Sequence, residues 1–533
     1  TSKTNNNQTT RTAKVTDAAI SARERVTQRA TMHRNQQEQA RIQAQTPTKT
    51  QYWSGSLAEA ILWIAVLFVP FMFCIFADRP TEFSKVMLVQ WLGAMGLVAI
   101  LLRAANTAPI HWRERLSFKK NPMLWVGFLG LAGALISTLN SVLPHLSWHG
   151  NHFRTQGFWT LGAQFVMFLL AALCLNAQSA RRVLLVTVFA STLPALYGIV
   201  QMLTIYLHDW GYLTGHSLDL VGWNWTATDR VQSSLGHPIY FGGYLLFTLP
   251  LALAFLYEAI QTRTATNHSR AKIISISIAL GLIALGLLTA NSRGPTVMGA
   301  GVIVGLTAII AIISRRNTAG VAGISALFMA VIGLVVAAVI AFNNSGFKSQ
   351  VEAVAPGLAR SFTFDLKDEA SSIYARVMRW NGSVKLYESA TPTQKWFGFG
   401  SDTVEFTYVN QMTTKQMHIV GGGYVSLIDR IHNHVQDTLV MTGIIGLIAE
   451  LLLYGIFVGV GFHFLGFLSG KPRWLLYGAS TVSMGIIGAY GLPAIIGALQ
   501  LLPQGDPSTG FWGLGLASGM LAGQFAYLLL QRL

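Results

Sequence analysis

Four residues, far apart in the sequence, have side chains suited to binding a phosphorylated substrate and moving a proton. Arg230, Arg293 and Arg376 carry permanent positive charges, and guanidinium groups bind phosphate oxygens in a forked geometry. His432 is a candidate general base, because an unperturbed imidazole has a pKa of about 6.5. The alternative interpretations are that such arginines contact lipid headgroups and that an isolated histidine is structural.

The composition excludes a soluble globular protein. Of 533 residues, 52% are hydrophobic and only 11% are charged, whereas a soluble domain carries about 25% charged residues. The net charge of +16 would suggest nucleic acid as a partner of a soluble protein. Membrane proteins collect Lys and Arg on their cytoplasmic side, so we expect no nucleic-acid partner. Cys74 and Cys174 lie in apolar runs, which predicts no disulfide.

Apolar runs predict an all-α membrane protein with about 12 transmembrane helices. A helix needs about 20 apolar residues to cross the hydrocarbon layer. The runs lie at about 57–76, 84–103, 122–142, 157–176, 182–204, 237–257, 272–290, 295–313, 320–342, 436–465, 474–496 and 509–531.

The charges between these runs predict the orientation. Connections rich in Lys and Arg, such as Lys119–Lys120, Arg181–Arg182 and Arg315–Arg316, alternate with poorer ones. By the positive-inside rule the richer side is cytoplasmic, which places both termini in the cytoplasm of an inner-membrane protein. Residues 1–51 lack an apolar face and are expected to form a disordered basic cytoplasmic tail, separate from the polytopic domain at 52–533.

A large extracytoplasmic loop, residues 342–435, is predicted between helices 9 and 10. Loops of this length are usually functional. Its stretch from Ala370 to Glu388 has the spacing of an amphipathic helix, and Gly398–Gly400 predicts a turn. The predicted topology places the three arginines and His432 at the outer face.

The sequence around these residues resembles the O-antigen ligase and O-antigen polymerase superfamily. His432-Asn433, followed after nine residues by Gly443-Ile-Ile-Gly446, is similar to the family's HN-x9-GxxG signature. RVQSSLGHPIYFGGYL from Arg230, TANSRG around Arg293, and ARVMRW with Arg376 and Trp380 followed by FGFG resemble further family motifs in the expected order. The chain departs from the family at His237-Pro238, where Asn-Pro is common, and it has an extra histidine at His434.

This resemblance implies transfer of a preassembled glycan from a polyprenyl diphosphate carrier to a hydroxyl acceptor, outside the cytoplasmic membrane. His432 is then expected to be the catalytic base. Arg230, Arg293 and Arg376 would bind the donor diphosphate, and Asn433, Gly443, Gly446 and Trp380 would support the site. The expected enzyme is an inverting glycosyltransferase of ligase type that needs no metal and no cofactor. Its expected partners are the carrier-linked glycan, membrane lipid and a lipid-, glycan- or protein-linked acceptor, as in lipopolysaccharide and cell-envelope polysaccharide biosynthesis.

Two groups of alternatives stay open. Transfer to another carrier-linked repeat would make the chain a polymerase, and transfer to a protein Ser or Thr would make it a protein O-oligosaccharyltransferase. A small-solute transporter is an alternative of a different class, since Glu450 lies inside the tenth predicted span and an ionisable residue within a membrane is a functional candidate.

Overall fold

The computed structural model describes residues 49–74, 81–105, 115–118, 120–152, 154–209, 231–262, 267–290, 372–411, 428–503 and 507–531, with a few isolated positions between 292 and 350 and at 417–418. Within these residues the chain is all-helical and has no strand. The predicted spans at 295–313 and 320–342, and nearly all of the predicted tail, lie outside the described residues.

Eight of the described helices are long and apolar enough to cross a membrane, as expected of a multi-pass membrane protein. They are α3 (Phe83–Ala105), α5 (Pro122–Leu139), α8 (Ala177–Asp209), α9 (Pro238–Gln261), α10 (Asn267–Thr289), α19 (His434–Phe464), α20 (Lys471–Ala498) and α21 (Trp512–Leu530). Two helices with shorter apolar stretches, α2 (Lys49–Phe68) and α7 (Phe158–Cys174), also coincide with predicted spans. Eight predicted spans thus correspond to described helices that could cross a membrane, and two more coincide with shorter apolar helices.

The helix starts follow local sequence signals. Proline, whose missing N–H is tolerated in a first turn, begins α5 at Pro122 and α9 at Pro238. His237 caps α9, because its Nδ1 accepts a hydrogen bond of 3.1 Å from the backbone N of Ile239. This histidine thus fills a capping position that asparagine, aspartate or serine commonly takes.

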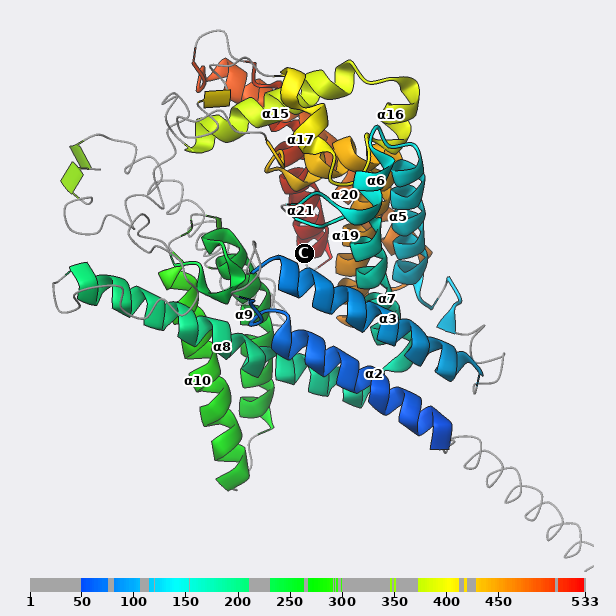
Figure 1. Ribbon diagram of the computed structural model, residues 1–533, viewed down its shortest axis with the longest axis vertical. Helices are drawn as coiled ribbons and strands as arrows, with labels where there is room; N and C mark the ends of the chain where they lie inside the picture. The colour runs from blue at the N-terminus through cyan, green and yellow to red at the C-terminus, as the bar shows by residue number, and fades with distance from the viewer. Residues whose placement is uncertain are drawn as a thin grey trace, which may run out of the picture.

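The helices form two groups, shown in Figure 1. In one, α5, α7, α19, α20 and α21 lie together, and in the other α8 packs against α9 and α10. α2 and α3 connect the groups through contacts with α7 and α8. α20 and α21 approach most closely: a Cβ atom on Gly515 would lie 2.1 Å from the carbonyl oxygen of Gly488. Small residues allow this close contact, as is common between membrane helices.

The described part of the predicted large loop is helical and packs against one end of the first group. It contains α15 (Ser372–Glu388), α16 (Pro392–Phe397), α17 (Val404–Thr407) and the 3-10 turn η3 (Val409–Gln411). α15 confirms the helix predicted for 370–388, and positive φ angles at Gly398 and Gly400 confirm the turn. A shared apolar core joins this segment to the starts of α19 and α21, which lie beneath it in Figure 1.

The tenth predicted span is not one continuous helix. Gly443 has φ 68° and ψ −167°, which breaks α19 into halves at 434–442 and 444–464. His434 and Glu450 form an ion pair, although 16 residues of a straight helix would separate them by about 24 Å. The first half therefore folds back beside the second. The apolar run predicted a span here, as the structure has it, but it did not reveal the reversal at Gly443.

Candidate active site

His432 lies in the segment 428–433, which leads into the first half of α19. Its φ is +60°, in the left-handed region, and part of the residue is open to solvent while protein atoms pack around the rest. The turn around it is held from both sides: the backbone N of Ile431 donates to Oδ1 of Asp437 at 2.9 Å, and the backbone N of Asp437 donates to the Asn433 carbonyl at 2.8 Å. A left-handed conformation is costly for a residue with a Cβ atom, so these contacts define where the imidazole sits.

Positive charges surround the imidazole of His432. Burial against protein atoms, followed by the charge of Arg379, lowers its pKa to about 4, and Arg376 and Arg154 act in the same direction. Asp429 partly opposes them. An imidazole with this pKa is uncharged at neutral pH, so its free nitrogen can accept a proton.

Arg376 and Arg379 come from the same face of α15, three residues apart. Burial lowers the pKa of both guanidiniums from the usual value; for Arg379 the charge of Asp429 opposes this effect and that of Arg376 adds to it. Among the described residues, Arg376 has no carboxylate partner. Two neighbouring, partly desolvated guanidiniums create a positive field that an anion would relieve.

Arg154, from the connection between α6 (Pro144–His149) and α7, bridges the two helix groups at this site. Its Nε donates to Oδ2 of Asp429 at 2.6 Å, and its Nη1 donates to the hydroxyl of Tyr240 on α9. Burial raises the pKa of the Asp429 carboxyl, but the charge and hydrogen bond of Arg154 outweigh burial and bring it below its ordinary value. Asp429 is therefore an ionised partner beside His432.

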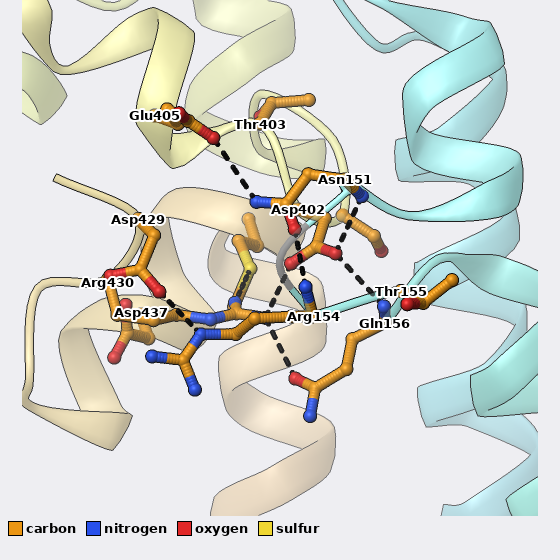
Figure 2. A network of polar contacts seen from close by, with 12 residues as sticks. Asn151, Arg154, Thr155, Gln156, Asp402, Thr403, Glu405, Asp429, Arg430 and Asp437 are labelled. Atoms are coloured by element: carbon orange, nitrogen blue, oxygen red, sulfur yellow. Dashed lines mark hydrogen bonds and ion pairs between the residues drawn. The ribbon is translucent and has the colours of Figure 1, made fainter. Parts of the chain in front are cut away.

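A second ion pair holds the neighbouring residue, as Figure 2 shows. Nη2 of Arg430 lies 2.6 Å from Oδ1 of Asp402, whose side chain is fully buried. The other oxygen of Asp402 accepts bonds of 3.0 Å from the backbone N atoms of Asn151 and Gln156. Asp402 thereby ties the α6–α7 connection and the loop after α16 to the segment that carries His432.

Glycines of the FGFG turn and of the GxxG motif meet at the break in α19. The backbone N of Phe399 donates to the Val440 carbonyl at 2.9 Å, and that of Gly400 donates to the Met441 carbonyl at 3.1 Å. A Cβ on Gly443 would lie 2.3 Å from the Trp396 carbonyl oxygen. The loop thus satisfies carbonyl groups that the broken helix leaves free. The two segments approach so closely at Gly398 and Gly443 that neither position has room for a side chain.

The remaining predicted supporting residues pack rather than face His432. The Trp380 ring contacts the Phe511 ring edge-on, with 5.2 Å between centroids. The amide of Asn433 lies against Gly513 at the start of α21, where an added Cβ would be 3.0 Å from its Nδ2. Gly446 faces Gly133 of α5. These contacts join α15, α19, α21 and α5 around the site.

Of the predicted site residues, Arg376 lies near enough to His432 for its charge to lower the pKa of the imidazole. Arg230 and Arg293 lie outside the described residues. Their described neighbours Val231 and Pro295 pack against α8 and α9: Val231 belongs to the core shared by α8–α10, and Pro295 contacts Gly242 of α9. Gly242 is two residues after Tyr240, the partner of Arg154.

Arg154, Arg379 and Asp429 were not among the residues predicted from the sequence. Arg379 could have been found, because a residue three positions after Arg376 shares its helix face. Arg154 and Asp429 are 275 residues apart, and no local pattern pairs them. In the described part of the chain, no three His, Cys, Asp or Glu side chains are placed to share a metal ion.

The fold and the site define an all-helical, multi-pass membrane protein with a cationic cluster around an uncharged histidine beside the end of its helices. The chain matches no protein-family model, no curated protein and no solved structure. The fold and the cluster are therefore the basis for assigning a function.

Proposed function

We propose that this chain is an O-antigen ligase-like glycosyltransferase of the outer face of the cytoplasmic membrane. It would move a preassembled glycan from a polyprenyl diphosphate carrier to a hydroxyl acceptor. The observation that carries the proposal is the juxtaposition of a partly exposed, uncharged imidazole, His432, with the guanidiniums of Arg376 and Arg379. A base next to fixed cations suits a reaction in which a hydroxyl loses a proton and a diphosphate leaves.

In the proposed reaction the acceptor hydroxyl attacks the anomeric carbon of the first sugar. The new carbon–oxygen bond forms as the bond to the diphosphate oxygen breaks, and the leaving polyprenyl diphosphate takes the electron pair. The proton of the hydroxyl passes to the free ring nitrogen of His432. Direct displacement of this kind inverts the anomeric centre. Preorganised guanidiniums stabilise the charge that develops on the leaving group.

The cluster links donor binding to the strength of the base. In the free protein, burial and the charges of Arg379 and Arg376 lower the pKa of His432 to about 4. A bound diphosphate would offset those positive charges and raise the pKa again. His432 would then be a stronger base when the donor is in place, which favours proton transfer in the productive complex.

Arg230 and Arg293 are proposed to complete the diphosphate site from the side of α9. Two contacts support this part of the proposal. Val231 and Pro295 pack near the start of α9, and Tyr240 in the first turn of α9 binds Arg154 of the His432 cluster. No metal is required in this mechanism, because the guanidiniums supply the positive charge.

The acceptor decides between ligase, polymerase and protein O-oligosaccharyltransferase, and we favour the ligase type on the resemblance of the loop that carries both ARVMRW and the HN motif. Transport is the less favoured function. Glu450, the residue that suggested it, contacts His434 and Thr438 within its own helix, which is the arrangement of a structural carboxylate.

The test is reconstitution of the purified protein with a polyprenyl diphosphate-linked oligosaccharide and, in separate reactions, a lipid A core, a second carrier-linked repeat and a Ser/Thr peptide. We expect the glycan on one of these acceptors, with the free carrier diphosphate as co-product and an unchanged rate in EDTA. Absence of product with all three acceptors would reject the proposal. Loss of transfer in EDTA that Mg²⁺ restores would reject the metal-free mechanism.

A further inference from the structure

We propose that Glu450 is a positioning residue for His432, through an ionic contact that fastens the folded-back half of α19 to the half that crosses the membrane. This inference rests on the proposed function, because it assigns Glu450 to the placement of the catalytic base. It gives a role to the carboxylate that the proposed reaction does not use.

The contacts of Glu450 require the reversal at Gly443. Its Oε1 pairs with Nε2 of His434, and its Oε2 accepts a hydrogen bond from Oγ1 of Thr438. Along a straight helix these partners would lie about 24 Å and 18 Å away. Both carboxylate oxygens of Glu450 thus contact one turn of the first half-helix across the break, and Tyr454, four residues later on the second half, also forms a hydrogen bond with Glu450.

The setting of Glu450 makes these contacts necessary. Its side chain is 17% exposed and belongs to an apolar helix, whereas His434 is 71% exposed. A carboxylate in a membrane helix is costly unless it is paired and hydrogen-bonded. The first half-helix supplies those partners, so the free energy of satisfying Glu450 favours the folded-back arrangement.

The half-helix carries His432 at its start. His434 is two residues after His432, so a shift of this end moves the imidazole with it. Other contacts also hold the half-helix: the carbonyls of Val440 and Met441 accept from Phe399 and Gly400 at its far end, and Nε2 of Gln436, in the turn that Glu450 contacts, donates to the Gly510 carbonyl at 2.8 Å. Loss of the Glu450 contacts is therefore expected to tilt the half-helix without releasing it.

The first experiment compares Glu450→Gln with Glu258→Gln. Glu258 pairs with Arg181 at 2.8 Å, near the end of α9 that is remote from Tyr240. Replacement of Glu258 therefore also breaks an ion pair but leaves the half-helix untouched. We expect kcat of Glu450→Gln to fall about 10- to 100-fold, the cost of a misplacement of about 1 Å, with KM nearly unchanged. Glu258→Gln should keep the wild-type kcat. A wild-type kcat in Glu450→Gln, or equal losses in both variants, would overturn the inference.

The second experiment replaces the ionic contact with a covalent one. His434→Cys/Glu450→Cys is prepared in a Cys74→Ala/Cys174→Ala background and treated with a short bifunctional thiol reagent. We expect an intramolecular cross-link, and we expect kcat to rise when the link forms, because it restores the position of the half-helix. Failure to cross-link would overturn the geometry, and a link without a rise in kcat would overturn the positioning role.

These outcomes separate the inference from the proposed function. If the protein transfers no glycan, the proposed function fails even when the cross-link forms. If the protein transfers glycan and His432→Ala does not, but Glu450→Gln is fully active, the proposed function stands and the positioning role of Glu450 is wrong.

Discussion

Arginines lie at both ends of the helix assembly, and the two ends use them differently. Near the ends of α8 and α9 remote from Tyr240, Arg182 donates two hydrogen bonds of 2.6 and 2.7 Å to Glu59, and Arg181 pairs with Glu258. About 27 Å away along α9, Arg154 pairs with Asp429, but Arg376 has no carboxylate partner among the described residues. At the first end both arginines have carboxylate partners, whereas at the second end Arg376 has none among the described residues.

This difference separates structural arginines from those suited to a ligand. The side chains of Arg181 and Arg182 are 42% and 45% exposed, and such pairs contribute about 0–1 kcal/mol each. At the other end, burial lowers the pKa of Arg376 and Arg379, so the protein holds two charges in an unfavourable setting. A cost of this kind is common at functional sites, where an incoming group of opposite charge offsets it.

The largest expected effect is the loss of glycan transfer in His432→Ala. Removal of a general base lowers a rate by about 10²- to 10⁴-fold, while the partly exposed side chain contributes little to packing, so expression and insertion should be normal. His434→Ala should lose less, because His434 contacts Glu450 and not the proposed acceptor. Initial rates with saturating donor measure both. More than about a tenth of the wild-type rate in His432→Ala would remove it from the role of base.

The next largest effect is expected in the free energy of unfolding, when an ion pair is broken at one end or at the other. Asp402→Asn leaves the charge of Arg430, which is 12% exposed, without its buried carboxylate. Breaking a buried pair in this way costs about 3–5 kcal/mol. Glu258→Gln breaks the exposed pair with Arg181 and should cost less than about 1 kcal/mol. Thermal unfolding of both variants in the same detergent measures the difference, and equal losses would show that the two ends are energetically alike.

A smaller effect is expected in the pH dependence. The pKa of His432 is lowered from 6.5 to about 4 in the folded protein. The acid limb of kcat/KM, which reports the free enzyme, should therefore lie near pH 4. The acid limb of kcat should lie at higher pH, because the bound diphosphate offsets the arginine charges. A kcat/KM limb near the ordinary histidine value would show that the cluster does not act on His432.

The lowered pKa of His432 also makes the stability of the folded protein depend on pH. Above pH 6.5 the imidazole is uncharged in both the folded and the unfolded chain. Between about pH 6.5 and 4 the unfolded chain binds a proton that the folded protein does not, so the contribution of His432 to stability is lost as the pH falls through this window.

The sequence was sufficient for those features that depend on local pattern. The amphipathic spacing around Val377 predicted α15, and the apolar runs predicted the eight described helices that are long and apolar enough to cross a membrane. The association of His432 with Arg376 was inferred from motif order. The break in α19 could not be predicted, because Gly443 stands in a continuous apolar run. The Arg154–Asp429 and Arg430–Asp402 pairs depend on how distant segments pack, which no local signal encodes.

The central claim is that the cluster of Arg376, Arg379 and His432 binds a diphosphate and that the paired arginines Arg181 and Arg182 do not. Binding of a short-chain prenyl diphosphate to wild type, Arg376→Gln and Arg182→Gln tests it directly. Loss of one charge-assisted contact in Arg376→Gln should weaken binding about 10- to 100-fold, while Arg182→Gln should bind as the wild type does. Wild-type affinity in Arg376→Gln, or an equal loss in Arg182→Gln, would contradict the account.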